Sequence, residues 1–114
     1  MKKILSLALL FLVLLSCPIN TLHAEVELKR SDITELVVYT NPRCGYCHRL
    51  ETFLKAENVP FTRKDITSDQ KAYEEFQELG GRGTPLSILK TKSEDKVISG
   101  YNLIEFERIA AAYD

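Results

Sequence analysis

Alternation between apolar and polar stretches divides the chain into seven predicted elements. Short apolar stretches predict strands over residues 36–40 and 86–89, and we predict two further strands over residues 61–66 and 96–98. Between and after these runs, apolar residues recur at helical spacing and predict helices over residues 44–57, 68–79 and 102–113. The predicted order along the chain is therefore β-α-β-α-β-β-α.

The predicted helices carry signals for their ends and for their buried faces. Thr67 together with Gln70, or Ser68 alone, is predicted to cap the second helix, and Asn102 with Glu105 should begin the third. The side chains expected to face inward are Cys47, Leu50 and Leu54 on the first helix, Tyr73, Phe76 and Leu79 on the second, and Leu103, Phe106, Ile109, Ala110 and Tyr113 on the third.

The connections predict how the strands pair. The first two strands are joined by a helix, so they should run parallel. The last two are joined by a short turn at residues 93–95, so they should run antiparallel. We therefore expect one α/β domain with a four-stranded mixed sheet flanked by helices.

The first 24 residues have the pattern of a signal peptide. Lys2 and Lys3 precede a near-apolar run of 12 residues that ends at Leu15, and this run is shorter than the roughly 20 residues that a membrane-spanning helix needs. The residues before and including Ala24 suit cleavage by a signal peptidase. We predict export to the periplasm, a polar lead-in over residues 25–34 and a folded domain over residues 35–114. The alternative is a lipoprotein anchored through Cys17.

The charge of the exported chain argues against one class of partner. Without residues 1–24 the chain carries 13 basic and 16 acidic residues, a net charge near −3. Neither a basic patch nor an interleaving of basic and aromatic residues is visible, so nucleic acid is not expected to bind. One small domain, acting as a monomer, is the predicted form.

The segment Cys44-Gly45-Tyr46-Cys47 joins the first predicted strand to the first predicted helix. Two thiols two residues apart at this position are typical of a redox dithiol. A helix N-terminus favours negative charge, so the pKa of Cys44 should be lowered. Cys47 falls one turn further in, on the buried face. This asymmetry suits disulfide exchange, in which an accessible thiolate attacks and a shielded thiol resolves the mixed disulfide.

Three further features are candidates for contact with a substrate. Pro85 precedes a buried strand, and a cis Thr84-Pro85 bond would place the Thr84 backbone beside the dithiol, where an extended peptide can pair with it. The N–H groups of the segment that begins at Gly100 and opens the last helix could hold a carboxylate. Arg43, next to Cys44, could stabilise the thiolate or attract an anionic substrate.

These residues together resemble the glutaredoxin family, which has the thioredoxin-like fold. The resemblance rests on residues 39–47, 83–85 and Gly100, and it covers nearly all of residues 35–113. Residues 44–48, 83–85 and 100–101 also resemble the catalytic domain of the bacterial periplasmic disulfide isomerase. The resemblance implies a thiol-disulfide oxidoreductase that needs no metal or organic cofactor. Its implied site consists of the redox-active pair Cys44 and Cys47, with Tyr46, Thr84, Pro85, Arg43 and Gly100 contacting the substrate.

The chain departs from the glutaredoxin pattern at several positions. Gly45 stands where proline is common, Asn41 where a basic residue is common, and residues 99–102 replace a Gly-Gly-x-Asp turn. Residues 36–40 also lack the buried carboxylate of thioredoxins. The expected partners are therefore disulfide- or thiol-bearing proteins, with glutathione as a co-substrate or a membrane electron donor as further candidates. The direction of the reaction stays open.

Alternative functions compete for the same motif. Residues 44–48 also fit the Cys-x-x-Cys-His pattern of c-type haem attachment, but the exported chain has no methionine and no histidine besides His48 to serve as a second axial ligand. A structural zinc site needs four ligands, and this segment supplies three at most. A binding module that keeps the fold without catalysis is the remaining alternative, although such modules typically lose one or both cysteines.

Overall fold

The computed structural model describes residues 27–114, so the predicted signal peptide and Cys17 lie outside the described residues. The elements are a 3₁₀ helix η1 (Arg30–Asp32), β1 (Ile33–Thr40), α2 (Gly45–Ala56), β2 (Thr62–Asp65), α3 (Gln70–Glu78), β3 (Leu86–Thr91), β4 (Asp95–Ser99) and α4 (Leu103–Ala111). This order confirms the predicted β-α-β-α-β-β-α sequence of elements. None of the helices in residues 27–114 has the length and apolarity that crossing a bilayer requires.

One four-stranded mixed sheet organises the domain, with the strand order β2-β1-β3-β4. β1 and β2 run parallel and β3 and β4 run antiparallel, as the lengths of the connections predict. β3 is also antiparallel to β1. β1 begins earlier than predicted: Ile33 and Thr34, expected in the polar lead-in, belong to the strand, and Ile33 pairs with Thr91. The reason is the length of β3, whose end at Thr91 extends the ladder beyond the apolar run of β1.

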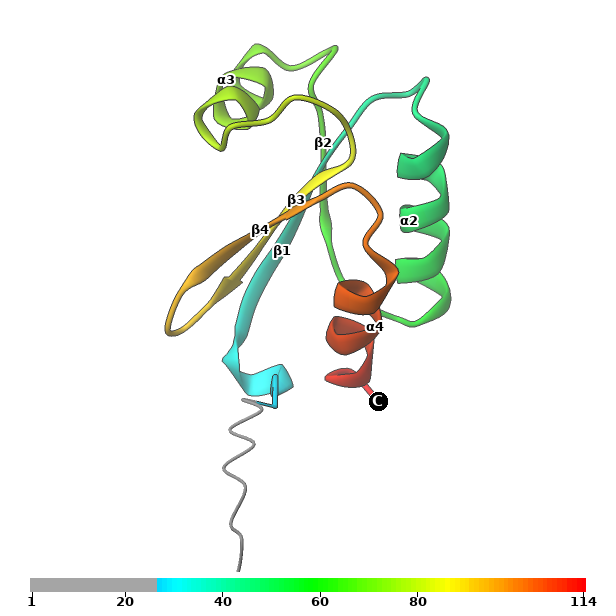
Figure 1. The fold of residues 1–114 in the computed structure, drawn as a ribbon, viewed down its shortest axis with the longest axis vertical. Coiled ribbons are helices and arrows are strands. Elements are labelled where there is room, and N and C mark those ends of the chain that lie inside the picture. The colour runs from blue at the N-terminus through cyan, green and yellow to red at the C-terminus, as the bar shows by residue number, and fades with distance from the viewer. Residues whose placement is uncertain (1–26) are drawn as a thin grey trace, which may run out of the picture.

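Helices cover both faces of the sheet (Figure 1), with α2 and α4 on one face and α3 on the other. Successive side chains of a strand point to opposite faces, and β1 divides accordingly. Leu36 and Val38 pack with α2 and α4, whereas Val37 and Tyr39 pack with α3. Because both faces of β1 are buried, its apolar run is continuous rather than alternating.

The start of α2 lies at one end of the domain, away from the described chain ends. Figure 1 shows α2 beginning at the top of the view, while η1 and the C-terminus lie at the bottom. Gly80, with a φ of +78°, follows the end of α3 and turns the chain toward β3. The connection from α3 to β3 therefore returns to the same end of the sheet as the start of α2.

Three predictions about the helices were wrong. Asp69 caps α3, because its carboxylate accepts hydrogen bonds from the N–H groups of Lys71 and Ala72, whereas Thr67 bonds to Asp65 instead. Tyr73 is 37% exposed and Leu103 is 46% exposed, although both were expected to face inward. On α3 the buried residues are Ala72 and Phe76, one turn apart, so the face that meets the sheet is rotated from the predicted one.

Candidate functional site

Cys44 and Cys47 form a disulfide at the start of α2, with their Cα atoms 5.2 Å apart. Cys44 is the residue before the first turn of the helix, and its Sγ accepts a hydrogen bond of 3.1 Å from the N–H of Cys47. Cys44 is partly exposed and Cys47 is only 1% exposed, on the same face as Leu50 and Leu54. The structure thus gives the two sulfurs the unequal accessibility that their predicted roles require.

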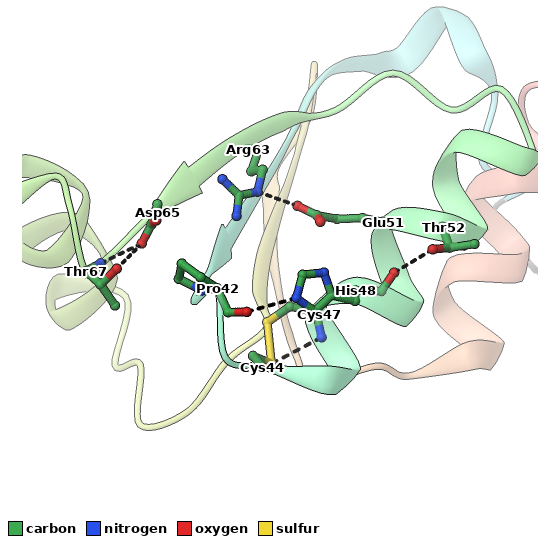
Figure 2. A network of polar contacts seen from close by, with 9 residues as sticks. All are labelled: Pro42, Cys44, Cys47, His48, Glu51, Thr52, Arg63, Asp65 and Thr67. Atoms are coloured by element: carbon green, nitrogen blue, oxygen red, sulfur yellow. Dashed lines mark hydrogen bonds and ion pairs between the residues drawn. A yellow bond between two sulfur atoms is a disulfide. The ribbon is translucent and has the colours of Figure 1, made fainter.

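The residues before Cys44 form a tight turn that side chains hold in place. The N–H of Arg43 donates to Oδ1 of Asn41, and the N–H of Cys44 donates to the carbonyl of Asn41, both at 3.0 Å. His48, one turn into α2, donates from Nε2 to the carbonyl of Pro42 at 2.9 Å, as Figure 2 shows. A carbonyl only accepts, so the proton of this bond is on Nε2. His48 therefore fixes the approach of the chain to Cys44, a role that sequence reasoning missed.

The Thr84–Pro85 segment lies against the dithiol. Its peptide bond is cis, and the carbonyl oxygen of Thr84 is 3.3 Å from Sγ of Cys44. In the dithiol state the Cys44 thiol can donate to this oxygen, whereas the disulfide has no proton to donate. Pro85 is buried and its carbonyl accepts a hydrogen bond of 2.8 Å from the N–H of Gly100. The structure thus brings the predicted residues Thr84 and Pro85 to the attacking sulfur.

Gly100 joins β4 to α4 through a turn with a φ of +71°, a conformation that glycine adopts without strain. Its N–H is donated to Pro85, so it is not free to hold a carboxylate, which corrects that part of the expectation. Asn102 caps α4 as predicted, accepting a hydrogen bond of 3.4 Å from the N–H of Glu105. Gly100 therefore contributes to the site by placing the start of α4 beside Pro85.

Two arginines and one tyrosine frame the exposed side of the dithiol. Tyr46, between the two cysteines, is 61% exposed. The guanidinium carbon of Arg49 lies 5.5 Å from the centre of the Tyr46 ring, close enough for a cation–π contact. Arg43 is exposed directly before Cys44. These three side chains are available to an approaching substrate.

Glu51 is a buried carboxylate that sequence reasoning missed. It lies one helical turn after Cys47, is 8% exposed, and makes an ion pair of 2.7 Å with Arg63 of β2 (Figure 2). Arg63 pairs in register with Val38, whose side chain faces α2, so the guanidinium projects toward the same helix. The available signal was the spacing of four residues between Cys47 and Glu51, which places both on the inward face of a helix.

A second ion pair lies on the opposite face of the sheet. Lys64 of β2 donates to Glu75 of α3 at 2.7 Å, and the hydroxyl of Tyr39 donates to the same carboxylate oxygen at 2.9 Å. These two hydrogen bonds lower the pKa of Glu75. Burial, followed by the hydrogen bond to Glu75, raises the pKa of Tyr39. This network joins α3 to the sheet and takes no part in the dithiol site.

Comparison with known proteins shows a likeness to glutaredoxin. Residues 36–86 match the family model of glutaredoxin. The chain is 26% identical over 73 residues to a protein of Clostridium pasteurianum named as an uncharacterized glutaredoxin-like 8.6 kDa protein in rubredoxin operon, a match that covers 63% of this chain and 92% of that protein. It is also 32% identical over 44 residues to the global transcriptional regulator Spx 1 of Oceanobacillus iheyensis, covering 39% of this chain and 34% of the regulator.

Solved structures agree with the fold. The crystal structure of the thioredoxin-like protein BC3987 superposes with a TM-score of 0.58 at 24% identity, covering 66% of this chain and 99% of that one. The thioredoxin of Trichomonas vaginalis superposes with a TM-score of 0.51 at 19% identity, covering 74% of this chain and 82% of that one. At these identities the likeness shows the shared α/β fold.

Proposed function

Because this chain carries a glutaredoxin-family domain of the thioredoxin-like superfamily, we propose that it is a thiol-disulfide oxidoreductase whose reacting groups are Cys44 and Cys47. The observation that carries the proposal is the placement of this pair. A partly exposed sulfur stands at a helix start beside the Thr84 carbonyl, and a buried sulfur stands one turn behind it. Disulfide exchange needs this combination of an accessible sulfur and a shielded one.

The reaction starts from either redox state of the pair. In the dithiol state, the Cys44 thiolate attacks a sulfur of the client disulfide, and the other client sulfur leaves as a thiolate that takes up a proton. The Cys47 thiol then loses its proton and attacks Cys44, which releases the second client sulfur. The client gains two electrons and two protons, and the protein ends as the disulfide. The reverse sequence oxidises a client dithiol, and the relative reduction potentials set the direction.

The surrounding residues position the client in this proposal. The backbone of Thr84, with Pro85 behind it, aligns an extended client segment beside Cys44. Tyr46 shapes the groove and Arg43 favours the thiolate through its positive charge. The N–H of Cys47, already directed at the Cys44 sulfur, stabilises that thiolate further.

Proteins with disulfides or thiols are the proposed clients, with glutathione or a membrane electron donor as candidates to renew the pair. No metal or organic prosthetic group is required, because the electrons reside in the two sulfurs. We place the protein in the periplasm as a monomer. That location rests on the sequence pattern of residues 1–24.

The test is the reduction of insulin disulfides by the purified protein with a dithiol as electron source. Wild type should accelerate the reduction, and Cys44→Ser should abolish the acceleration. Cys47→Ser keeps the attacking sulfur and should accumulate a mixed disulfide with the client. Full activity in Cys44→Ser would overturn the assigned roles. A wild type that does not accelerate the reduction, together with a Cys47→Ser variant that forms no mixed disulfide, would favour a binding module. A haem absorption band in the purified protein would favour a c-type haem protein.

A further inference from the structure

The charged residues around the dithiol differ in sign from the net charge of the rest of the chain. Three segments meet there: residues 41–49, residues 80–85 and residues 99–104, joined by the contacts of Cys44 with Thr84 and of Pro85 with Gly100. Together they contain three arginines and one histidine and no aspartate or glutamate. The rest of the chain contains 12 basic and 16 acidic residues, so its net charge is negative. The dithiol therefore lies among segments that carry cations and no carboxylate, in a chain whose other residues are net acidic.

The three arginines are free to meet a ligand. Arg43, Arg49 and Arg82 are exposed, and none of them forms an ion pair with a carboxylate of residues 27–114. Two of them lie near the reacting sulfur along the chain, and the third lies near Thr84, which contacts that sulfur. Arg43 precedes Cys44, Arg82 lies two residues before Thr84, and Arg49 lies over the ring of Tyr46. All three cations therefore belong to the segments that meet at Cys44.

We propose that the physiological client is a protein segment whose cysteine is flanked by acidic side chains. This inference rests on the proposed function and names the substrate class of the same site. Carboxylates on either side of the client cysteine would pair with Arg43, Arg49 and Arg82 while its sulfur meets Cys44. Arginine suits this task because its planar guanidinium binds a carboxylate through two hydrogen bonds.

The same charges favour a peptide over glutathione. Glutathione is an anion, but it also carries an ammonium group, and the three segments offer no carboxylate to bind it. The nearest acidic residue along the chain, Glu105 in the first turn of α4, already binds Lys96 at 2.9 Å and Arg108 at 3.7 Å. An internal protein segment has no free ammonium to satisfy.

Exposed apolar side chains near the site also suit a protein client. Tyr46 is 61% exposed, and Leu103 and Ile104 at the start of α4 are 46% and 74% exposed. Gly100 brings this end of α4 beside Pro85. A client segment can bury its apolar side chains against these exposed residues, whereas a small zwitterion such as glutathione cannot gain stability in this way.

The test compares the single-turnover reduction of matched peptide disulfides by the pre-reduced protein. The peptides share one cysteine and differ only in whether glutamate, glutamine or lysine flanks it, and glutathione disulfide is the fourth substrate. Because the chain contains no tryptophan to report oxidation by fluorescence, the reaction is stopped with acid and the products are separated by chromatography. At a salt concentration of about 0.02 M the acidic peptide should react about tenfold faster than the neutral one, and at about 0.5 M the ratio should fall to about two.

Two triple variants isolate the cause. In Arg43→Gln/Arg49→Gln/Arg82→Gln the ratio of acidic to neutral rates should fall close to one. The matched control, Lys55→Gln/Lys71→Gln/Lys92→Gln, removes three cations that make no ion pair in residues 27–114 and lie outside the three segments, and it should keep the ratio. The ratio is the proper readout, because loss of Arg43 also changes the reactivity of Cys44 toward every substrate.

Each outcome separates the inference from the proposed function. Equal rates for the acidic and neutral peptides, an equal loss of preference in the lysine control, or faster reduction of glutathione disulfide than of the acidic peptide would overturn the inference while leaving the oxidoreductase intact. Reduction of none of the four disulfides would overturn the proposed function itself.

Discussion

Replacing Arg63 by glutamine would leave the Glu51 carboxylate buried without its counter-charge, one turn from Cys47. The side chain of Glu51 is 11% exposed, whereas that of Arg63 is 43% exposed. Removing one partner of a fully buried ion pair costs about 3–5 kcal/mol. Water reaches the Arg63 side of this pair, so we expect Arg63→Gln to lower the free energy of unfolding by about 2 kcal/mol.

Substituting the other partner of the ion pair, Glu51, should lower the free energy of unfolding by less. Glu51→Gln leaves a guanidinium that already contacts water, and it loses one charge-assisted hydrogen bond, so the expected cost is about 1 kcal/mol. In the double variant Glu51→Gln/Arg63→Gln no charge is left buried. Its loss of unfolding free energy should therefore be smaller than the sum of the losses in the two single variants. The double-mutant cycle should give a coupling energy of about 1 kcal/mol.

Urea unfolding followed by far-ultraviolet circular dichroism measures these differences. The disulfide is kept intact throughout, so that one covalent state is compared. With an m-value of about 1 kcal/mol/M for a domain of this size, the midpoint for Arg63→Gln should move down by about 2 M. A cost for Glu51→Gln equal to or above that for Arg63→Gln would refute the reasoning, because it would mean that the carboxylate is not the desolvated partner.

The Arg63→Gln variant should also affect disulfide exchange. Residues four apart on a helix have Cβ atoms about 5–6 Å apart, so an uncompensated carboxylate at Glu51 lies close to the Cys47 sulfur. Negative charge there disfavours a thiolate on Cys47. Arg63→Gln should therefore slow the resolution of a mixed disulfide, while its first step, the attack by Cys44, should change less.

Further predictions address other parts of the fold and the site. The Ser87 hydroxyl is buried without a hydrogen-bond partner in residues 27–114, so Ser87→Ala should raise the unfolding free energy by about 1 kcal/mol in urea titrations; a loss of stability would show that the hydroxyl has a partner. Asp69→Ala should cost about 1 kcal/mol in the same assay, since it removes the cap of α3, and an unchanged midpoint would contradict that cap. Hydrogen bonds lower the pKa of Glu75 in the folded state, so its contribution to stability should be complete above the unfolded-state pKa of about 4.3 and be lost as the pH falls through the lowered folded-state pKa. The stability difference between wild type and Glu75→Gln should follow this course, and a difference that persists at acid pH would exclude the ionic contribution.

The order of the elements, the strand directions and the placement of the dithiol could be predicted because local patterns determine them. Cys44 precedes a helix because Pro42 ends the strand and apolar residues then recur at helical spacing. Asn102 starts α4 because its side chain can bond to an N–H three residues later. Such signals lie within a few residues of the feature that they predict.

The sequence predictions failed in two situations: where neighbouring residues compete for one role, and where a contact joins segments that are distant in the sequence. Asp69, Ser68 and Thr67 can each cap a helix, and the geometry of the Asp65 turn, which uses Thr67, decides among them. The Glu51–Arg63 ion pair depends on the register of β2 against β1, which no local pattern reports.

His48 and Tyr73 illustrate the same limit on helix surfaces. His48 reaches the Pro42 carbonyl only because the turn before Cys44 folds back over the first turn of α2. Tyr73 turns outward because Ala72 is small enough to let α3 approach the sheet at its own position. Both outcomes follow from how the elements meet rather than from their own sequences.

The central claim is that Cys44 and Cys47 exchange electrons as a pair, and the redox equilibrium of the purified protein with glutathione tests it most directly. Fractions of dithiol and disulfide are measured by thiol alkylation and mass spectrometry across a series of glutathione redox ratios. We predict a single two-electron transition, with a midpoint in the range of about −270 to −120 mV found for dithiol proteins, and an intramolecular Cys44–Cys47 disulfide as the oxidised product. A protein whose cysteines ignore the glutathione ratio, or each acquire glutathione without ever joining, would contradict the account.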